Sequence, residues 1–173
     1  QRPQGRPTRP AGPPVELVIE TVGGEGDGMA PGPAFVPFTL PGERVSATGS
    51  GERRDLLAVL EPSPQRIAPV CPHFGACGGC ALQHWAHEPY LAWKVERLTG
   101  TLARQGVETE ILAAFAAGPG TRRRVALHAR RGSREAAKLG YKARKSWDLV
   151  DIAVCPISDP AIQAAIPALK RLA

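Results

Sequence analysis

The chain has 173 residues, 43% hydrophobic residues and a formal net charge of +6. The length allows one ordinary domain or two small ones, and the hydrophobic content is sufficient for a core. No apolar run approaches the roughly 20 residues of a membrane-spanning helix, and the first 14 residues lack the apolar stretch of a signal peptide. We therefore expect no membrane partner and a cytoplasmic location, where cysteines stay reduced.

The first part of the chain predicts short β-strands. Residues 1–14 are rich in proline and arginine and predict a flexible basic arm. Pro37 favours an edge strand or a bulge for the run around it. Close spacing of the runs, together with 19 Gly and 18 Pro in the chain, predicts a small β-barrel over residues 15–65. The predicted strands are residues 15–22, 34–39, a run entered near Val45, and 55–60, with a tight turn at 23–28.

Three of the four cysteines lie close together, as Cys71-Pro-His-Phe-Gly-Ala-Cys77-Gly-Gly-Cys80, and Cys155 lies far along the chain. Four thiolates can hold a tetrahedral zinc ion or an iron–sulfur cluster. Only Cys77 and Cys80 have the Cys-x2-Cys spacing that zinc ribbons usually show twice. The spacing favours a cluster and leaves zinc, or cysteines without a metal, as alternatives. A shared metal would fasten two distant parts of the chain together.

The second half predicts two helices around a basic hairpin. Apolar residues recur at helical spacing over 88–105, which predicts a helix that ends at Gly106. Residues 122–131 and 138–152 predict two paired strands. Asp159 followed by Pro160 predicts the beginning of a last helix.

Basic residues gather on this hairpin. Residues 121–145 contain ten Lys or Arg and one acid, Glu135. Arginine makes planar, bidentate contacts with phosphate, so the distribution favours RNA over a merely solvated basic face. Tyr141, Trp147 and His128 could stack on unpaired bases, with burial in the core as the alternative for each. The candidate RNA-binding residues are Arg122, Arg123, Arg124, Arg130, Arg131, Lys142, Arg144 and Lys145, with Arg134 and Lys138 as further candidates.

Several other polar and aromatic residues invite a role. His84 and the other histidines beside the cysteines are expected to be structural, because four cysteines already complete a site. Trp85 and Trp93 are expected to pack around the first helix and to shield the metal from solvent. Asp148 and Asp151 are expected to pair with arginines rather than to act as general acids or bases.

Three motifs, in order, resemble those of the RNA (uracil-5-)-methyltransferases, S-adenosylmethionine enzymes that act on 23S rRNA or tRNA. Gly24–Ala30 and Phe35–Val45 resemble the TRAM domain, an OB-like, RNA-binding β-barrel. The run from Cys71 to His84, followed by Tyr90-Leu-Ala-Trp-Lys94, resembles the family's cluster segment. Gly140–Ile157 resembles its central domain, including the fourth cysteine. The resemblance covers roughly residues 15–170.

The resemblance implies a [4Fe-4S] cluster on Cys71, Cys77, Cys80 and Cys155, RNA as the partner and a monomer. It implies a mainly β first part and an α+β second part. The family places its methyl-donor domain, with the catalytic cysteine and the S-adenosylmethionine site, after the central domain. We therefore assign no catalytic or cofactor-binding residue here and expect this segment alone to be inactive. The implied segments are the barrel, a cluster segment (66–87), a helix and linker (88–120) and a partial central domain (121–173).

Two alternatives remain open on the same residues. The basic hairpin and a four-cysteine zinc site would together form a free-standing RNA-binding module. A cluster whose oxidation state alters RNA affinity would form a redox sensor.

Overall fold

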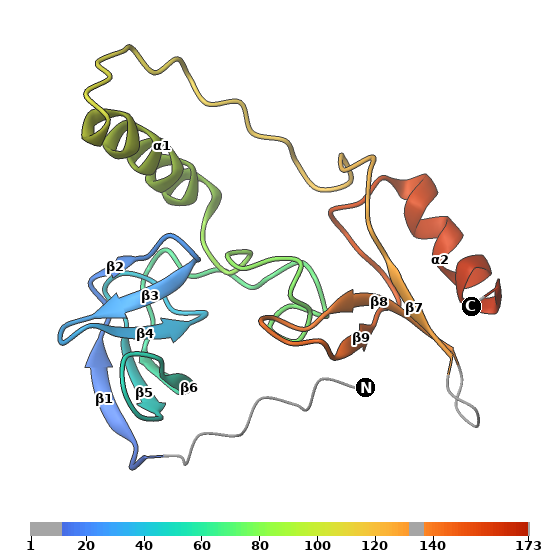
Figure 1. Cartoon of the computed structure of the whole chain (residues 1–173), viewed down its shortest axis with the longest axis horizontal. Helices are drawn as coiled ribbons and strands as arrows, with labels where there is room; N and C mark the ends of the chain where they lie inside the picture. The colour runs from blue at the N-terminus through green and yellow to red at the C-terminus, as the bar shows by residue number, and fades with distance from the viewer. Residues whose placement is uncertain (1–11, 132–136, 173) are drawn as a thin grey trace.

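A computed structural model describes residues 12–131 and 137–172 (Figure 1). Most of the predicted basic arm lies outside the described residues, and so does Arg134, one of the further RNA-binding candidates. The described chain forms three antiparallel sheets of three strands each and two helices, so the mainly β first part and α+β second part are confirmed. The elements are β1 (Val15–Val18), β2 (Thr21–Val22), β3 (Asp27–Ala30), β4 (Ala34–Pro37), β5 (Arg44–Thr48), β6 (Asp55–Glu61), α1 (His87–Arg104), β7 (His128–Arg130), β8 (Lys138–Lys142), β9 (Leu149–Asp151) and α2 (Pro160–Leu172).

Strands β1 to β6 form two small sheets, which we call the N-terminal sheets. Their strand orders are β1-β5-β6 and β2-β3-β4. Their shared core contains Ile19, Ala30, Val36 and Val45, all at most 5% exposed. Burial of such aliphatic side chains is the main stabilising contribution here. Closure of the two sheets into a barrel, and the domain boundaries implied by the family, stay predictions.

The prediction of one strand over residues 15–22 is wrong, because the chain crosses between the two sheets at Ile19. The Ile19 N–H donates to the Glu43 carbonyl, whereas the Glu20 N–H donates to the Met29 carbonyl in β3. Strand β3 begins within the glycine-rich run, where the sequence predicts only a tight turn. Gly28 fits there because a Cβ at this position would lie 2.0 Å from Thr39 Oγ1.

A buried carboxylate links the N-terminal sheets to the segment that follows them. Glu43 is fully buried and accepts hydrogen bonds from the Leu40 N–H at 2.9 Å and from Arg66 Nη2 at 2.8 Å. Burial alone would raise the pKa of Glu43, but the hydrogen bonds from Arg66 and Leu40 outweigh it and lower the pKa. Arg66 follows the last strand, so this contact returns the chain to the sheets just before the cysteines.

Helix α1 contacts the N-terminal sheets mainly through the aromatic residues at its beginning. Trp85, Tyr90 and Trp93 form one aromatic group, with the two indole rings 5.7 Å apart, that packs against Val22 and Leu40. Trp93 Nε1 also donates to the Val22 carbonyl at 3.0 Å. The expected packing of these tryptophans around α1 is confirmed, and neither of them is among the residues that surround the four cysteines. Shielding of a metal from solvent stays a prediction. The rest of α1 extends away, and within the described residues neither helix is long and apolar enough to cross a bilayer (Figure 1).

The second part is the sheet β7-β8-β9 with α2 packed against it. Its core contains Leu139, Ile152, Cys155 and Ile166. The predicted return strand over 138–152 splits into β8 and β9, which pair with each other. The predicted strand over 122–131 shortens to β7, because Arg122 leaves it to bond with Ile157 and Asp159. The capping prediction is confirmed: Asp159 Oδ1 accepts the Ala161 N–H at 2.8 Å.

Candidate metal centre and nucleic-acid interface

All four cysteines line one cavity of about 210 Å³, which we call the cysteine cavity. Cys71, Cys77 and Cys80 come from the loop after the N-terminal sheets, and Cys155 comes from the segment after β9. All four are free thiols. Two residues that are 84 positions apart in the chain, Cys71 and Cys155, therefore meet at one site.

The cysteine loop lies along β8. The Gly78 N–H donates to the Lys142 carbonyl at 2.9 Å, and Cys77 pairs with Ala143 as an antiparallel bridge. Gly78 is required by this approach, since a Cβ there would lie 2.7 Å from the Lys142 oxygen and 2.8 Å from the Arg144 nitrogen. Sheet-type contact therefore places Cys77 beside the second part of the chain.

Cys155 is held at the opposite wall of the cavity. It is 8% exposed, and its Sγ lies 3.8 Å from Tyr141 Oη. His73 Nε2, from the cysteine loop, accepts the Ala153 N–H at 3.1 Å. This bond ties the loop to the segment that carries Cys155.

Burial in the cavity raises the pKa of two of its thiols and of its tyrosine. Burial raises the pKa of the Cys77 and Cys80 thiols above their ordinary value of 9.0. Burial, followed by the contact with Cys155, raises the pKa of Tyr141 to about 12. A cationic group that binds here must displace the thiol protons, and its own charge would favour the thiolates.

The cysteine cavity brings four free thiols to one space of about 210 Å³. Four cysteine thiolates can hold a tetrahedral zinc ion or an iron–sulfur cluster. Among the described residues, no three His, Cys, Asp or Glu side chains are arranged to hold a metal ion. The kind of metal group at this site therefore stays a prediction.

Five of the predicted RNA-binding residues form an exposed group, which we call the arginine strip. Its members flank β7 or lie at its end, and within the described part of the chain none of them forms an ion pair. Unpaired, exposed guanidinium groups are available to phosphate. The strip consists of Arg122, Arg123, Arg124, Arg130 and Arg131.

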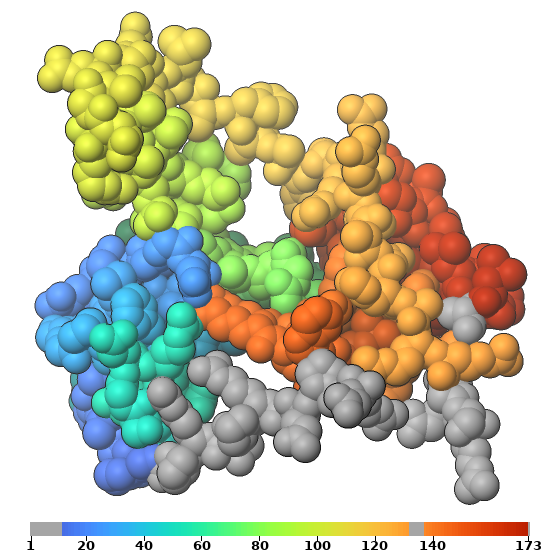
Figure 2. Space-filling model, viewed as in Figure 1, coloured from blue at the N-terminus to red at the C-terminus, as the bar shows by residue number. Residues whose placement is uncertain are grey.

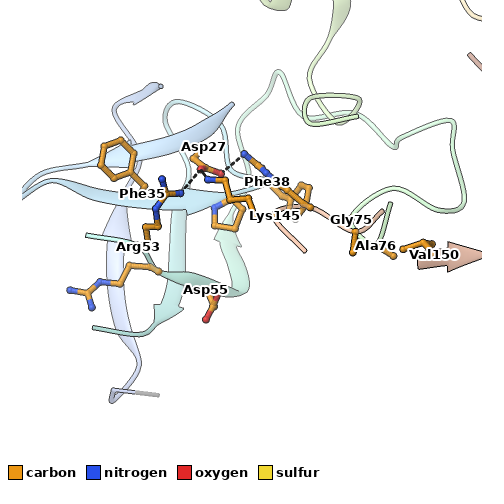
Figure 3. Close-up of a pocket in the computed structure, with 13 residues that line it drawn as sticks. Asp27, Phe35, Phe38, Arg53, Asp55, Gly75, Ala76, Lys145 and Val150 are labelled. Atoms are coloured by element: carbon orange, nitrogen blue, oxygen red, sulfur yellow. Dashed lines mark hydrogen bonds and ion pairs between the residues drawn. The ribbon is translucent and has the colours of Figure 1, made fainter. Parts of the chain in front are cut away.

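Arg144 and Lys145 have a different environment from the arginine strip. Arg144 Nη2 lies 2.8 Å from Asp27 Oδ1, and Lys145 Nζ lies 3.2 Å from Asp27 (Figure 3). Lys145 Nζ also lies 2.6 Å from Glu25. Arg53 adds a third cation, 3.8 Å from Asp27. We call these five residues the sheet–hairpin junction, because they join the N-terminal sheets to the β8–β9 turn, which meet in Figure 2.

The junction borders a cavity of about 650 Å³ that sequence reasoning missed. Arg53 and Arg54 line it from the N-terminal sheets, together with Phe38 (Figure 3). The adjacent arginines in a glycine-rich turn were a weak signal for it. Phe38 and Lys145 both have positive φ angles, 62° and 53°, which bulky residues rarely adopt.

The remaining candidates lie at or near the surface. Lys142 Nζ lies 3.6 Å from the centroid of the Trp147 ring, and Trp147 is 67% exposed, so the core alternative for Trp147 is wrong. Asp151 pairs with Lys170 of α2 at 2.7 Å, and Asp148 accepts a hydrogen bond from Ser146. The expected arginine partners of these two acids are absent among the described residues.

Comparisons with known proteins agree on one class of relative, although no family model matches the chain. A Caulobacter vibrioides protein named as an uncharacterized RNA methyltransferase is 56% identical over 163 residues, covering 91% of this chain and 39% of that protein. A 23S rRNA (uracil(1939)-C(5))-methyltransferase of Halomonas elongata is 38% identical over 167 residues, covering 90% of this chain and 35% of that enzyme. Its counterpart in Alkalilimnicola ehrlichii is 36% identical over 171 residues. The chain spans 35–39% of the length of these relatives.

Proposed function

Because the chain belongs to the RNA (uracil-5-)-methyltransferase family and matches an N-terminal portion of its members, we propose that it is the RNA-recognition and iron–sulfur portion of such an enzyme. The observation that carries the proposal is the match of about nine tenths of the chain to 23S rRNA uracil-C5 methyltransferases. The parent would use S-adenosylmethionine as the methyl donor and 23S rRNA, or alternatively tRNA, as the substrate.

Methyl transfer would be performed outside these residues. In the proposed reaction, a cysteine thiolate adds to C6 of uracil, and C5 then attacks the methyl group of the sulfonium donor. A base removes the C5 proton and the thiolate leaves, which restores the ring. All four cysteines of this chain line the cysteine cavity. The nucleophile and the donor site would therefore lie in the part of the relatives that this chain does not span.

The cysteine cavity would hold a [4Fe-4S] cluster on Cys71, Cys77, Cys80 and Cys155. The presence of four free cysteines, from two distant parts of the chain, on one cavity supports this assignment. When bound, the cluster would supply four iron–thiolate bonds that fasten the cysteine loop to the segment after β9. This chain's residues position those thiols: Gly78 lets the loop approach β8, and His73 links the loop to Ala153.

Metal analysis tests this assignment. The chain, purified without oxygen, should contain about four irons per molecule and absorb broadly in the visible range. Cys155→Ser should lower the iron content, whereas His87→Ala, on the exposed beginning of α1, should leave it unchanged. One zinc and no iron would contradict the cluster and support the alternative of an RNA-binding module with structural zinc.

RNA binding by the arginine strip has its own test. Each neutralised phosphate contributes about 0.7 to the slope of log affinity against log salt for a single strand. Replacing Arg123, Arg124 and Arg130 together by Ser should therefore lower the slope by about 2. The matched control replaces three arginines on the helices, Arg97, Arg104 and Arg171. Equal slopes in both triple variants would contradict a phosphate-binding role for the strip.

A further inference from the structure

Trp147 presents a large apolar ring at the surface of the β8–β9 turn. It is 67% exposed, whereas Trp85 is 5% exposed and Trp93 packs in the aromatic group at the beginning of α1. Single exposed hydrophobic residues are common, so exposure alone says little. Two further features distinguish this ring: the contacts that hold the turn and the charges that surround it.

The turn that carries Trp147 is ordered on both sides of the ring. The Ala143 N–H donates to the Asp148 carbonyl at 2.8 Å, and Ser146 Oγ donates to the Asp148 carboxylate at 2.8 Å. Lys145 adopts a φ of 53°, a conformation that persists only where surrounding contacts impose it. Its ion pairs with the N-terminal sheets supply those contacts. The ring is therefore presented at little further cost in conformational entropy.

The cations beside Trp147 are already committed to carboxylates. The Arg144 side chain is only 17% exposed and lies 2.8 Å from Asp27, which is itself 7% exposed. Lys145 lies 2.6 Å from Glu25. A phosphate that bound either cation would have to break an ion pair of the sheet–hairpin junction. The groups on this turn that remain for a ligand are the Trp147 ring and Lys142.

Lys142 makes the ring a better surface for a nucleobase. Its ammonium group lies 3.6 Å from the ring centroid, a cation–π contact that covers one face. The exposure of the side chain leaves room on the other face. Nucleobases stack on aromatic faces of this kind with little regard to sequence.

We propose that Trp147 is a stacking platform for an unpaired base of RNA, and that the β8–β9 turn recognises the strand through this stack rather than through phosphate charge. The inference rests on the proposed RNA-binding function and assigns a separate task to each surface. The arginine strip supplies the salt-dependent part of the affinity, and Trp147 supplies a part that salt changes little. The ligand class is a single-stranded segment, since paired bases have no free face to offer.

Binding of a single-stranded fragment of 23S rRNA to the full chain separates these contributions. Trp147→Ala should lower the affinity about 5- to 150-fold, the usual range for one base stacked on an aromatic side chain, with an unchanged salt slope. Trp147→Phe should retain part of the affinity. The triple variant of Arg123, Arg124 and Arg130 should instead lower the slope. Iron content and far-ultraviolet circular dichroism establish that each variant is folded.

Tryptophan fluorescence gives a direct readout. RNA should quench the emission of the wild-type chain, and Trp147→Phe should abolish most of that quenching while Trp85 and Trp93 remain. An RNA strand with abasic positions should quench less than the normal strand. Full affinity in Trp147→Ala, or unchanged quenching in Trp147→Phe, would overturn the stacking while leaving RNA binding in place. Failure of the wild-type chain to bind any RNA would overturn the proposed function, and the stacking with it.

Discussion

His84 is an imidazole enclosed by aromatic rings. It is 1% exposed, and neither ring nitrogen has a hydrogen-bond partner among the described residues. Its ring lies 5.2 Å from Phe74 and 6.5 Å from Phe38. Burial, followed by the nearby charge of Arg66, lowers the pKa of His84 to about 4, despite the opposing effect of Glu43. The folded chain therefore keeps this ring neutral.

This burial makes stability depend on pH. Below its ordinary pKa of 6.5, His84 binds a proton in the unfolded chain but not in the folded one until the pH approaches 4. Stability should thus fall as the pH decreases through this window, by up to about 3 kcal/mol. We expect His84→Phe to remove this component, as measured by urea unfolding at about pH 7 and about pH 4.5. His87→Phe, at an exposed position, is the control, and an identical pH dependence in His84→Phe and the wild type would refute the account.

At the scale of elements, the contact of the cysteine loop with β8 depends on one glycine. We expect Gly78→Ala to push the loop away from β8, because its Cβ would meet backbone atoms of three residues at 3.0 Å or less. Such overpacking costs about 1–3 kcal/mol. The midpoint temperature of thermal unfolding and the iron content should both fall. Gly118→Ala is the matched control, since nothing lies within 4 Å of its Cβ. A Gly78→Ala chain with wild-type iron content would contradict this role.

Elements with a strong local pattern were predictable from the sequence, and those decided by distant contacts were not. Helix α1 follows its apolar spacing, and α2 begins where Asp159 and Pro160 indicate. The break at Ile19 was not visible, because both sides of it are β-branched and only the partners Glu43 and Met29 differ. Strand β7 is short because Arg122 bonds to residues near Cys155, a contact with no local signal.

At the scale of the whole molecule, one buried acid, Asp27, links the N-terminal sheets to the β8–β9 turn. Asp27 contacts Arg144, Lys145 and Arg53, and the partner Lys145 is 118 residues away along the chain. No sequence pattern relates residues so far apart. The acidic partners of Arg144 and Lys145, two of the predicted phosphate-binding residues, were therefore not predictable. The cysteines were recognisable only because three of them are adjacent in the sequence and chemically distinctive.

We expect Asp27→Asn to loosen the N-terminal sheets from the β8–β9 turn. The loss should be about 1–3 kcal/mol, because Arg144, whose side chain is 17% exposed, loses its carboxylate partner. Lys145 and Arg53 are more exposed to water and keep Glu25 as a partner. The free energy of unfolding, from urea titration, should fall by an amount in this range. Glu25→Gln should cost much less, since its side chain is 64% exposed and its charge is screened by water. Equal losses in the two variants would argue against Asp27 as the centre of the junction.

The separation of the cysteines along the chain also has a consequence in time. During synthesis, Cys71, Cys77 and Cys80 emerge from the ribosome before Cys155, which follows Cys80 by 75 residues. At the usual rate of about 5–20 residues per second, the interval is roughly 4–15 s. The N-terminal sheets can fold during that interval, but the cavity has only three of its four thiols. A metal group inserted before Cys155 arrives would have one open coordination position, so a four-cysteine centre would be completed only with the later half of the chain.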